Sequence, residues 1–250
     1  MSEKNPTAAV LIIGNEILSG RTADSNLNAI AKKLATIGVK LSEARVVADI
    51  EAEIVAAVNA LRARYDYVIT TGGIGPTHDD ITAASIAKAF GVPVVEHPEA
   101  CSRLANYYGD RINEARLRMA RVPQGAALID NPVSAAPGIR MGNVYILAGV
   151  PAIMEAMMDT VAAELRHGPA IHSIAVAGAT AESTIAGELA QTAANWPALD
   201  IGSYPWFRNG QYGTSLVVRG TDEKAVKAAA DQLFALLAKH GGKPEIEAQG

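Results

Sequence analysis

The most constrained part of this 250-residue chain is residues 67–82, which read YVITTGGIGPTHDDIT. Val68 and Ile69 stand among β-forming residues without any charge, so this segment is expected to begin as a buried strand. The strand is followed by three glycines within four positions, which are Gly72, Gly73 and Gly75. Glycine permits positive φ angles and close backbone approach, so such a turn presents unpaired N–H groups. We therefore expect this turn to bind an anion, most simply a phosphate.

The residues that follow the glycine turn predict the start of a helix and contribute two acids. Thr77 is a favourable N-cap, and an alanine-rich amphipathic segment continues from it to the residue before Gly91. Asp79 and Asp80 would then lie in the first helical turn, where negative charge suits the helix dipole. These acids would also repel the phosphate that the turn attracts, and a divalent cation held between carboxylate and phosphate removes that conflict. The alternative for Asp80 alone is a capping-box acid that reaches back to Thr77.

Two widespread phosphate-binding motifs do not match this turn. A Walker A loop requires a lysine after its last glycine, whereas this chain has Pro76 at that point. A Rossmann fingerprint would require a glycine at the position of His78. The turn therefore belongs to another type of nucleotide-binding loop.

Strands and helices alternate along the first part of the chain. Strand patterns at 8–13 and 39–47 are each followed by a helical pattern, at 26–37 and 51–64. This alternation predicts an α/β fold with a parallel sheet and right-handed crossovers. Ligands bind beyond the carboxyl ends of such strands, so the polar residues at these ends are expected to converge. Besides the glycine turn, these residues are Gly14, Asn15, Glu16 and Asp49.

The segment from 92 to 130 is less regular. A short edge strand near Val94 precedes a predicted helix over residues 98–120, which carries several arginines. We interpret these arginines as a solvated helix face that pairs with Glu114 and Asp110. The alternative is that one arginine reaches a substrate phosphate, which suits the forked geometry of the guanidinium group.

The remaining chain predicts a hairpin and then a second domain. Residues 139–148 form the hairpin pattern, and Gly168-Pro169 is a natural boundary. We therefore assign residues 8–168 to a first domain and residues 170–242 to a second. The order of patterns in the second domain is βαββα, which indicates a small α+β module of the ferredoxin-like type.

Composition limits the classes of function that the chain can perform. Hydrophobic residues make up 49% and charged residues 19%, which is enough for a sizeable core. The net charge of −4 argues against nucleic acid as a partner. A single cysteine excludes an intramolecular disulfide, and the five scattered histidines form no zinc motif. Without a signal peptide or an apolar run of membrane-spanning length, we expect a cytoplasmic protein with no membrane partner.

The glycine turn and its two acids resemble the molybdopterin-binding (MoCF, MogA-like) domain family. The form GPTxDD is most similar to the N-terminal region of the competence/damage-inducible (CinA) proteins, and it also resembles a region of eukaryotic FAD synthases. Further matching blocks are Gly14-Asn15-Glu16 with Asp24-Ser25-Asn26, the loop that begins at Asn131, and the turn Gly149-Val150-Pro151. The chain departs from the family pattern at Asn15, Ser134 and Ala148, where Asp, Gly and Pro are usual.

This resemblance implies a fold, a set of site residues and an assembly. The fold is a three-layer αβα sandwich with a mostly parallel sheet, followed by the small second domain and without the deamidase domain of full-length CinA proteins. Asp49 and Asp80 match the two acids implicated in catalysis or metal binding. The implied nucleotide- or phosphate-binding residues are Gly14, Asn15, Glu16, Gly72, Gly73, Gly75, Pro76, Thr77, Asp79, Asn131 and Gly149. Family members form dimers or trimers, so we expect a homo-oligomer, and the aromatic region 196–207 is a candidate interface.

Three functions fit these residues. The first is a hydrolase that uses a divalent cation (Mg, Mn or Co) to convert ADP-ribose or a related dinucleotide to AMP and a phosphate ester. The second is an adenylyltransferase or binding protein for molybdopterin in molybdenum cofactor biosynthesis. The third is a non-catalytic module that binds a nucleotide or a pterin. The intact set of acids argues against the third, and nothing in the sequence supplies an evident pterin pocket for the second. In each case the partner is a small molecule.

Overall fold

A computed structural model describes residues 5–208 and 210–247 of the chain. The chain divides into two compact units, Met1–Gly168 and Pro169–Gly250. Each unit has its own sheet and its own hydrophobic core, so each is described by itself.

The first unit is built on a six-stranded sheet with the order β2-β1-β3-β8-β7-β6. In that order the strands are Lys40–Val47, Thr7–Ile13, Tyr67–Thr71, Val144–Leu147, Gly138–Met141 and Ala127–Ile129. The first four pair in parallel, whereas β7 is antiparallel to both β8 and β6. The predicted mostly parallel sheet is confirmed, and the predicted hairpin is formed by β7 and β8.

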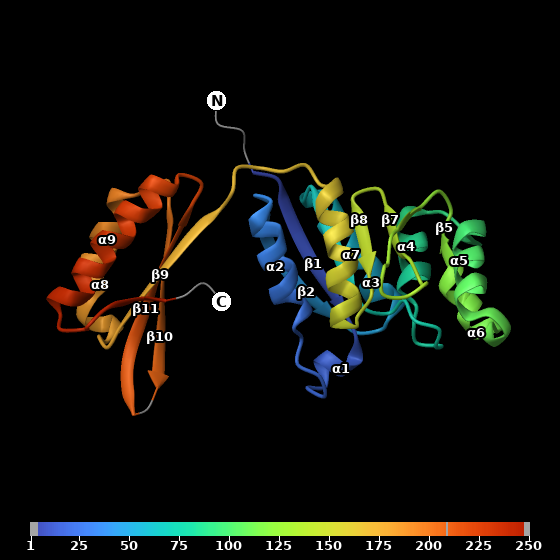
Figure 1. Ribbon diagram of the computed structural model, residues 1–250, viewed down its shortest axis with the longest axis horizontal. Helices are drawn as coiled ribbons and strands as arrows, with labels where there is room; N and C mark the ends of the chain where they lie inside the picture. The colour runs from blue at the N-terminus through green and yellow to red at the C-terminus, as the bar shows by residue number, and fades with distance from the viewer. Residues whose placement is uncertain (1–4, 209, 248–250) are drawn as a thin grey trace. The chain divides into compact units, whose positions relative to one another are not determined.

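Helices cover both faces of this sheet, which confirms the predicted three-layer αβα sandwich. Alternate residues of β1 face opposite sides, with Ala8, Val10 and Ile12 in one core cluster and Ala9, Leu11 and Ile13 in another. The helices that pack on the first side are α2 (Asn26–Thr36) and α7 (Pro151–Glu164), which lie side by side in Figure 1. The other side is covered by α3 (Glu51–Arg64) and α4 (Thr82–Phe90).

The prediction of a single helix over residues 98–120 is wrong, because the segment forms two separate helices and two 3₁₀ turns. Helix α5 (Pro98–Tyr108) ends at Gly109, whose φ of 51° departs from helical geometry. The Asn113 side chain then begins α6 (Glu114–Leu117) by accepting the Arg116 N–H. Two 3₁₀ turns flank α6, and the segment lies between β4 (Val94–Glu96) and β5 (Arg121–Pro123), which form a separate two-stranded sheet. Figure 1 shows α5 and α6 at the end of the unit beyond β5.

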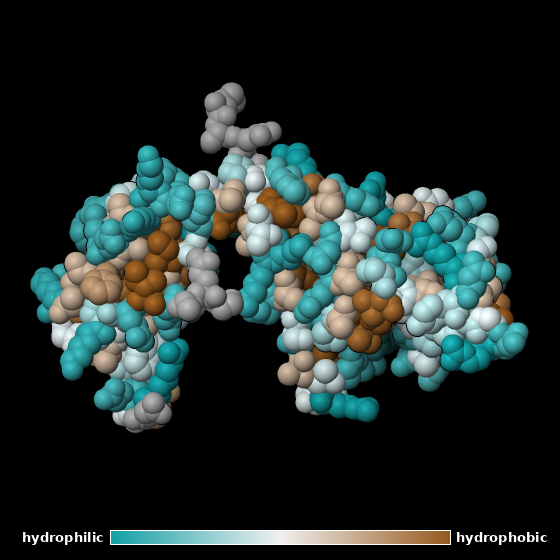
Figure 2. All heavy atoms as spheres, in the orientation of Figure 1, coloured by the Kyte–Doolittle hydropathy of each residue, from teal (hydrophilic) through white to brown (hydrophobic). Residues whose placement is uncertain are grey.

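The second unit is an α+β module with an antiparallel sheet, as predicted. Its elements are β9 (His172–Gly178), α8 (Glu182–Asn195), β10 (Asp200–Arg208), β11 (Gln211–Gly220), α9 (Glu223–Lys239) and β12 (Glu245–Glu247). The strand order β10-β11-β9-β12 is that of a ferredoxin-like βαββαβ unit, in which β12 adds a strand beyond the predicted βαββα pattern. Apolar side chains from both helices and the sheet form one core cluster, and hydrophobic atoms gather between helices and strands in Figure 2.

Two side chains of the predicted aromatic region and its hairpin are exposed. Phe207 and Tyr212 face each other across β10 and β11 with ring centroids 4.6 Å apart, and both are more than half accessible to solvent. Their role as an oligomer interface remains a prediction. Within the described residues, none of the helices has the length and hydropathy needed to cross a membrane.

Candidate functional site

Five strands of the first unit end at the same edge of the sheet. Strands β1, β2, β3 and β8 are parallel, and β6 runs in the same direction because β7 is antiparallel to both β8 and β6. A cavity of about 640 Å³ lies at this edge, and the segment that follows each of the five strands contributes to its lining. This is the position where ligands bind in open α/β sheets.

The structure brings most of the predicted site residues to this cavity. The lining includes Gly14, Glu16, Asp49, Gly72, Gly73, Gly75, Pro76, Asp79, Asp80, Asn131 and Gly149. Asn15 and Thr77 do not line it, but each is hydrogen-bonded to an acid that does. The predicted convergence of strand ends is therefore observed, whereas the chemical role of each residue remains a prediction.

The glycine turn packs so closely that two of its positions have no room for a side chain. Gly72 has a φ of +99°, and a Cβ atom there would lie 2.1 Å from the carbonyl oxygen of Ile13. Gly73 has a φ of +67°, and a Cβ atom there would lie 2.2 Å from the hydroxyl of Thr82. That hydroxyl donates to the Gly72 carbonyl at 2.9 Å, so the turn is fixed between β1 and the start of α4. Glycine is therefore the only residue that can adopt these φ angles and also fit the space at positions 72 and 73.

The residues after the turn do not begin a helix, so that part of the prediction is wrong. Helix α4 starts at Thr82 and not after Thr77. The Asp80 carboxylate instead accepts the Gly75 N–H at 2.7 Å and the Thr77 N–H at 2.8 Å. Asp80 thus reaches back to Thr77 as the capping-box alternative proposed, but it holds the glycine turn in place and caps no helix.

This bonding corrects the expectation that all amides of the turn are free. The N–H groups of Gly75 and Thr77 are occupied by Asp80, whereas those of Gly73 and Ile74 donate to no acceptor within the described chain. Gly73 and Ile74 are consecutive and both line the cavity. Successive backbone N–H groups next to a left-handed residue form a concave site for anions. The amides of the turn that remain available to an anion are therefore those of Gly73 and Ile74.

Two carboxylates share the hydroxyl of Thr77. The Thr77 Oγ1 atom lies 2.6 Å from Asp79 Oδ1 and 2.5 Å from Asp80 Oδ2, although a hydroxyl has only one proton to donate. The bond from Thr77 lowers the pKa of the Asp79 carboxyl from its ordinary value, so this exposed acid stays ionised. Two carboxyl groups therefore lie close together beside the glycine turn, at a place where they could share a cation.

Asp49 connects the ends of β1 and β2. Its Oδ2 atom accepts the backbone N–H of Asn15 at 2.8 Å, while its Oδ1 atom accepts no hydrogen bond within the described chain. Any residue other than proline offers this N–H, so the presence of Asn15 in place of the usual Asp leaves the contact intact. The carboxylate of Glu16 folds back over Gly14, where a Cβ atom would lie 2.5 Å from its Oε1.

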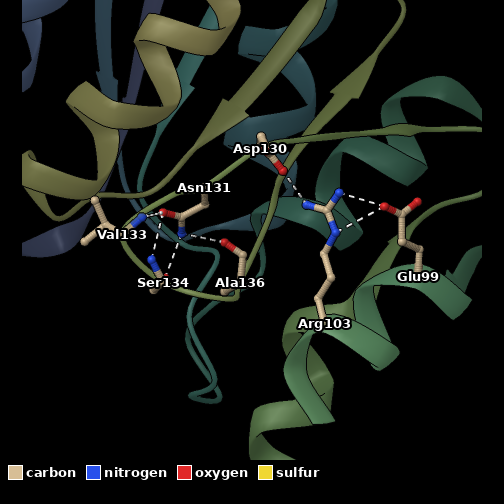
Figure 3. Close-up of polar contacts among 7 residues, drawn as sticks. All are labelled: Glu99, Arg103, Asp130, Asn131, Val133, Ser134 and Ala136. Atoms are coloured by element: carbon tan, nitrogen blue, oxygen red, sulfur yellow. Dashed lines mark hydrogen bonds and ion pairs between the residues drawn. The ribbon is translucent and has the colours of Figure 1, made fainter. Parts of the chain in front are cut away.

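Asn131 organises its own loop, as Figure 3 shows. Its Oδ1 atom accepts the N–H groups of Val133 and Ser134, both at 3.1 Å. Its Nδ2 atom donates to the Ser134 hydroxyl and to the Ala136 carbonyl, both at 2.7 Å. Because both the oxygen and the nitrogen of the Asn131 amide are hydrogen-bonded within the loop, Asn131 fixes the shape of this wall of the cavity. The Ser134 hydroxyl accepts one of these bonds, which the usual glycine at this position could not do.

We expect Asn131→Asp to destabilise the protein by about 1–3 kcal/mol, because the new carboxylate has no donor for the Ala136 carbonyl. Urea unfolding would measure this loss. The matched control is Asp130→Asn, which breaks an exposed ion pair with Arg103 (2.7 Å, Figure 3) and should change stability by less than about 1 kcal/mol. Equal losses of unfolding free energy in the two variants would show that the hydrogen bonds of the Asn131 amide contribute no more to stability than the exposed ion pair does.

The sequence did not identify one wall of the cavity, which comes from α5 and the segment after it. Tyr108, Arg116 and Met119 line the cavity, although the arginines of this segment were interpreted as a solvated face. Arg118 does follow that interpretation, since it pairs with Glu114 at 3.8 Å. A regular helix over 98–120 gives no reason to separate Arg116 from Arg118, and the break at Gly109 is what separates them.

The charges around the cavity determine which ligands it can accept. Its lining contains the four carboxylates Glu16, Asp49, Asp79 and Asp80 but only one basic side chain, Arg116. An anionic ligand would be repelled unless a cation accompanied it. In the described part of the chain no three acidic, histidine or cysteine side chains are close enough to hold a metal alone. Mg²⁺ commonly takes one or two carboxylates and completes its shell with water and substrate phosphates, and this donor set fits that mode.

Comparison with protein families gives two matches that together span nearly the whole chain. A family model described as "Probable molybdopterin binding domain" matches residues 9–167. A second model, described as "FAD synthase, middle domain", matches residues 170–244. The boundary between the matches falls at the boundary between the two structural units.

Individual relatives agree with these matches. A protein of Archaeoglobus fulgidus is 34% identical over 91% of this chain and 96% of its own length. The "Probable FAD synthase" of Caenorhabditis elegans is 32% identical over 94% of this chain, which spans only half of that enzyme. A Pyrobaculum calidifontis protein is 40% identical, and 62% of its length is covered. The crystal structure of the protein CinA from Thermoplasma acidophilum, described as having unknown function, is 35% identical, with a TM-score of 0.61 over 65% of this chain and 99% of that one.

Proposed function

Because this chain belongs to the molybdopterin-binding domain family and is CinA-like, we propose that it is a metal-dependent nucleotide pyrophosphatase. It would hydrolyse a dinucleotide such as ADP-ribose to AMP and a phosphate ester. One observation carries the proposal: two free amides of the glycine turn and four carboxylates line a single cavity at the carboxyl ends of the strands. Amides alone would indicate an anion site, and carboxylates alone a cation site. Their combination favours a phosphate ligand that arrives with a divalent cation.

Each group of residues in the cavity would have a separate role in the hydrolysis. The N–H groups of Gly73 and Ile74 would bind one phosphate and hold it in place. Asp49 and Asp80 would hold a divalent cation (Mg, Mn or Co), which would neutralise phosphate charge and polarise a phosphoryl oxygen. Of the remaining carboxylates, Asp79 or Glu16 would accept a proton from the attacking water.

The atoms balance in a simple hydrolysis. The oxygen of water bonds to the phosphorus of the adenylyl group, and the bond from that phosphorus to the bridging oxygen breaks. The bridging oxygen leaves with the phosphate ester, which takes up the proton that water has lost. ADP-ribose and water therefore give AMP and ribose 5-phosphate, and FAD and water give AMP and FMN.

The cavity suits a ligand that is longer than a mononucleotide. It reaches from Asp49, which follows β2, to Asn131, which follows β6. Strands β2 and β6 in this sheet are five strand spacings of about 4.8 Å apart, which is roughly 24 Å. Among dinucleotides, FAD is the first to test beside ADP-ribose, because the second unit matches the middle domain of FAD synthase.

A second candidate is a protein that binds or adenylates molybdopterin. The description of the family matched by residues 9–167 favours it. The same cavity would serve, with a pterin phosphate in place of water as the nucleophile. A third candidate, a module that binds a nucleotide or pterin without chemistry, uses the same contacts and differs only in turnover.

We expect the purified protein to release AMP from ADP-ribose, FAD or NAD when Mg²⁺, Mn²⁺ or Co²⁺ is present, and to stop when EDTA removes the metal. Chromatographic separation of AMP from the substrate measures the reaction. The cation requirement follows from the excess of carboxylates in the cavity. Release of AMP that is unchanged by EDTA would contradict the metal-assisted mechanism.

Other outcomes separate the three candidates. Consumption of ATP only when molybdopterin is added would support the adenylyltransferase. Tight binding of nucleotide or pterin without any turnover would leave the non-catalytic module. Adding each metal back after EDTA, one at a time, identifies the cation that the site uses.

A further inference from the structure

We infer that Arg116 is a specificity-determining residue that binds a second phosphate, so that the cavity selects pyrophosphate compounds over monophosphates. This inference rests on the proposed function and names the part of the substrate that the site recognises. It starts from the position of Arg116, which lines the cavity together with Tyr108 and Met119.

The Arg116 side chain is already held in one orientation. Its guanidinium carbon lies 4.3 Å from the centroid of the Tyr108 ring, which is a favourable cation–π distance. Its Nη1 atom donates to the carbonyl oxygen of Arg111, and its backbone N–H donates to Asn113 at 2.9 Å. A side chain fixed in this way loses little conformational entropy when it binds a ligand.

Among the described residues, Arg116 forms no ion pair with a carboxylate. Three other arginines of the same region form ion pairs, namely Arg103 with Glu99 and Asp130, Arg118 with Glu114, and Arg121 with Glu96. In contrast to these three, Arg116 has no carboxylate oxygen within 4.0 Å of its guanidinium nitrogens in residues 5–208 and 210–247. A fixed, uncompensated guanidinium at a cavity wall is suited to an anion, and its planar fork matches the oxygens of a phosphate.

Arg116 and the proposed metal-binding acid Asp49 belong to different ends of the cavity. Asp49 follows β2 at one edge of the sheet, and the glycine turn follows β3 near the middle. Tyr108 and Met119 pack in one cluster with Ala136, whose loop follows β6 at the other edge. A phosphate bound at Gly73 and Ile74 would thus lie between Asp49 and Arg116. A second phosphate joined to the first would extend toward the guanidinium, which a monophosphate lacks the length to reach.

Binding of two non-substrate nucleotides tests this inference without any need for turnover. The ligands are α,β-methylene-ADP, whose phosphates cannot be separated by hydrolysis, and AMP, both titrated calorimetrically with Mg²⁺ present. We expect the wild type to bind α,β-methylene-ADP more tightly than AMP. Arg116→Met should weaken binding of α,β-methylene-ADP by about 10- to 100-fold and binding of AMP by less than about 3-fold. Arg116→Lys, which keeps the charge but not the fork, should fall between the two.

The matched control is Arg118→Met, two residues away, which removes an arginine that pairs with Glu114 and does not line the cavity. It should bind both ligands as the wild type does. An unchanged ligand preference in Arg116→Met would overturn the inference, and so would equal weakening for both ligands, which indicates a structural role. Absence of α,β-methylene-ADP binding by the wild type would also overturn it. Intact selectivity without release of AMP from any dinucleotide would overturn the proposed hydrolysis alone.

Discussion

Gly72→Ala should lower the free energy of unfolding by about 3 kcal/mol or more, and it should disrupt the cavity at the same time. The added Cβ would lie 2.1 Å from the carbonyl oxygen of Ile13, which belongs to the backbone of β1, a strand paired on both sides, and cannot rotate away. The φ of +99° at this position is also unfavourable for any residue with a side chain.

The surroundings of Gly72 leave no easy path for relaxation. Its N–H donates to Leu147 at 3.3 Å, and its carbonyl accepts the Thr82 hydroxyl at 2.9 Å. Gly149 lies on another side, where its own Cβ would be 3.3 Å from the Gly72 Cα. The ends of β1, β3 and β8 therefore meet at Gly72, and a shift of this residue would move three of the segments that line the cavity.

Urea unfolding of Gly72→Ala and Gly91→Ala would test this expectation. Gly91 has a positive φ of +69° at the end of α4, but nothing lies within 4 Å of the place that a Cβ would take. Its replacement should therefore cost only about 1 kcal/mol, which is the conformational preference of glycine alone. The difference between the two variants isolates the effect of close packing, and similar losses in both would mean that the contact with Ile13 is easily relieved.

The parts of the fold that follow from local patterns were predictable from the sequence. The helices Asn26–Thr36 and Glu51–Arg64 and the strand Tyr67–Thr71 lie at or near the residues expected for them. Convergence of Glu16, Asp49 and the glycine turn was also predictable, because parallel strands place their carboxyl ends at one edge. These features depend on patterns within single segments and on one rule of topology.

The features that escaped prediction depend on contacts between segments or on competition between local structures. The Thr77-x-x-Asp80 spacing fits both a capping box and a turn, and the glycine turn upstream decides in favour of the turn because Asp80 also accepts the Gly75 N–H. Arg116 and Arg118 are equivalent in a sequence pattern. They differ only after α5 has ended at Gly109 and Tyr108 has come to lie beneath the Arg116 guanidinium.

Asp80→Ala should reduce AMP release from the preferred dinucleotide by at least about 100-fold. Two effects act together in the proposed mechanism. The variant loses one of the two carboxylates that would hold the cation, and it leaves the N–H groups of Gly75 and Thr77 without their acceptor. The turn that presents the Gly73 and Ile74 amides is then no longer fixed, and a displacement of about 1 Å at such a site can cost a factor of about 100 in rate. Initial rates of AMP formation at saturating metal measure the loss.

Asp79→Ala is the matched control, because Asp79 adjoins Asp80, lines the same cavity and shares the Thr77 hydroxyl, but holds no amide of the glycine turn. It should reduce the rate by less than about 10-fold if the water is activated by Glu16, and by about 100-fold if Asp79 is itself the general base. Thr77→Val measures the contribution of the shared hydroxyl alone, since it removes that hydroxyl and keeps the N–H that Asp80 accepts. A loss confined to Asp80→Ala would identify the carboxylate that holds the glycine turn as the one on which hydrolysis depends. Wild-type rates in Asp80→Ala would instead place the chemistry on other residues and leave Asp80 a purely structural role.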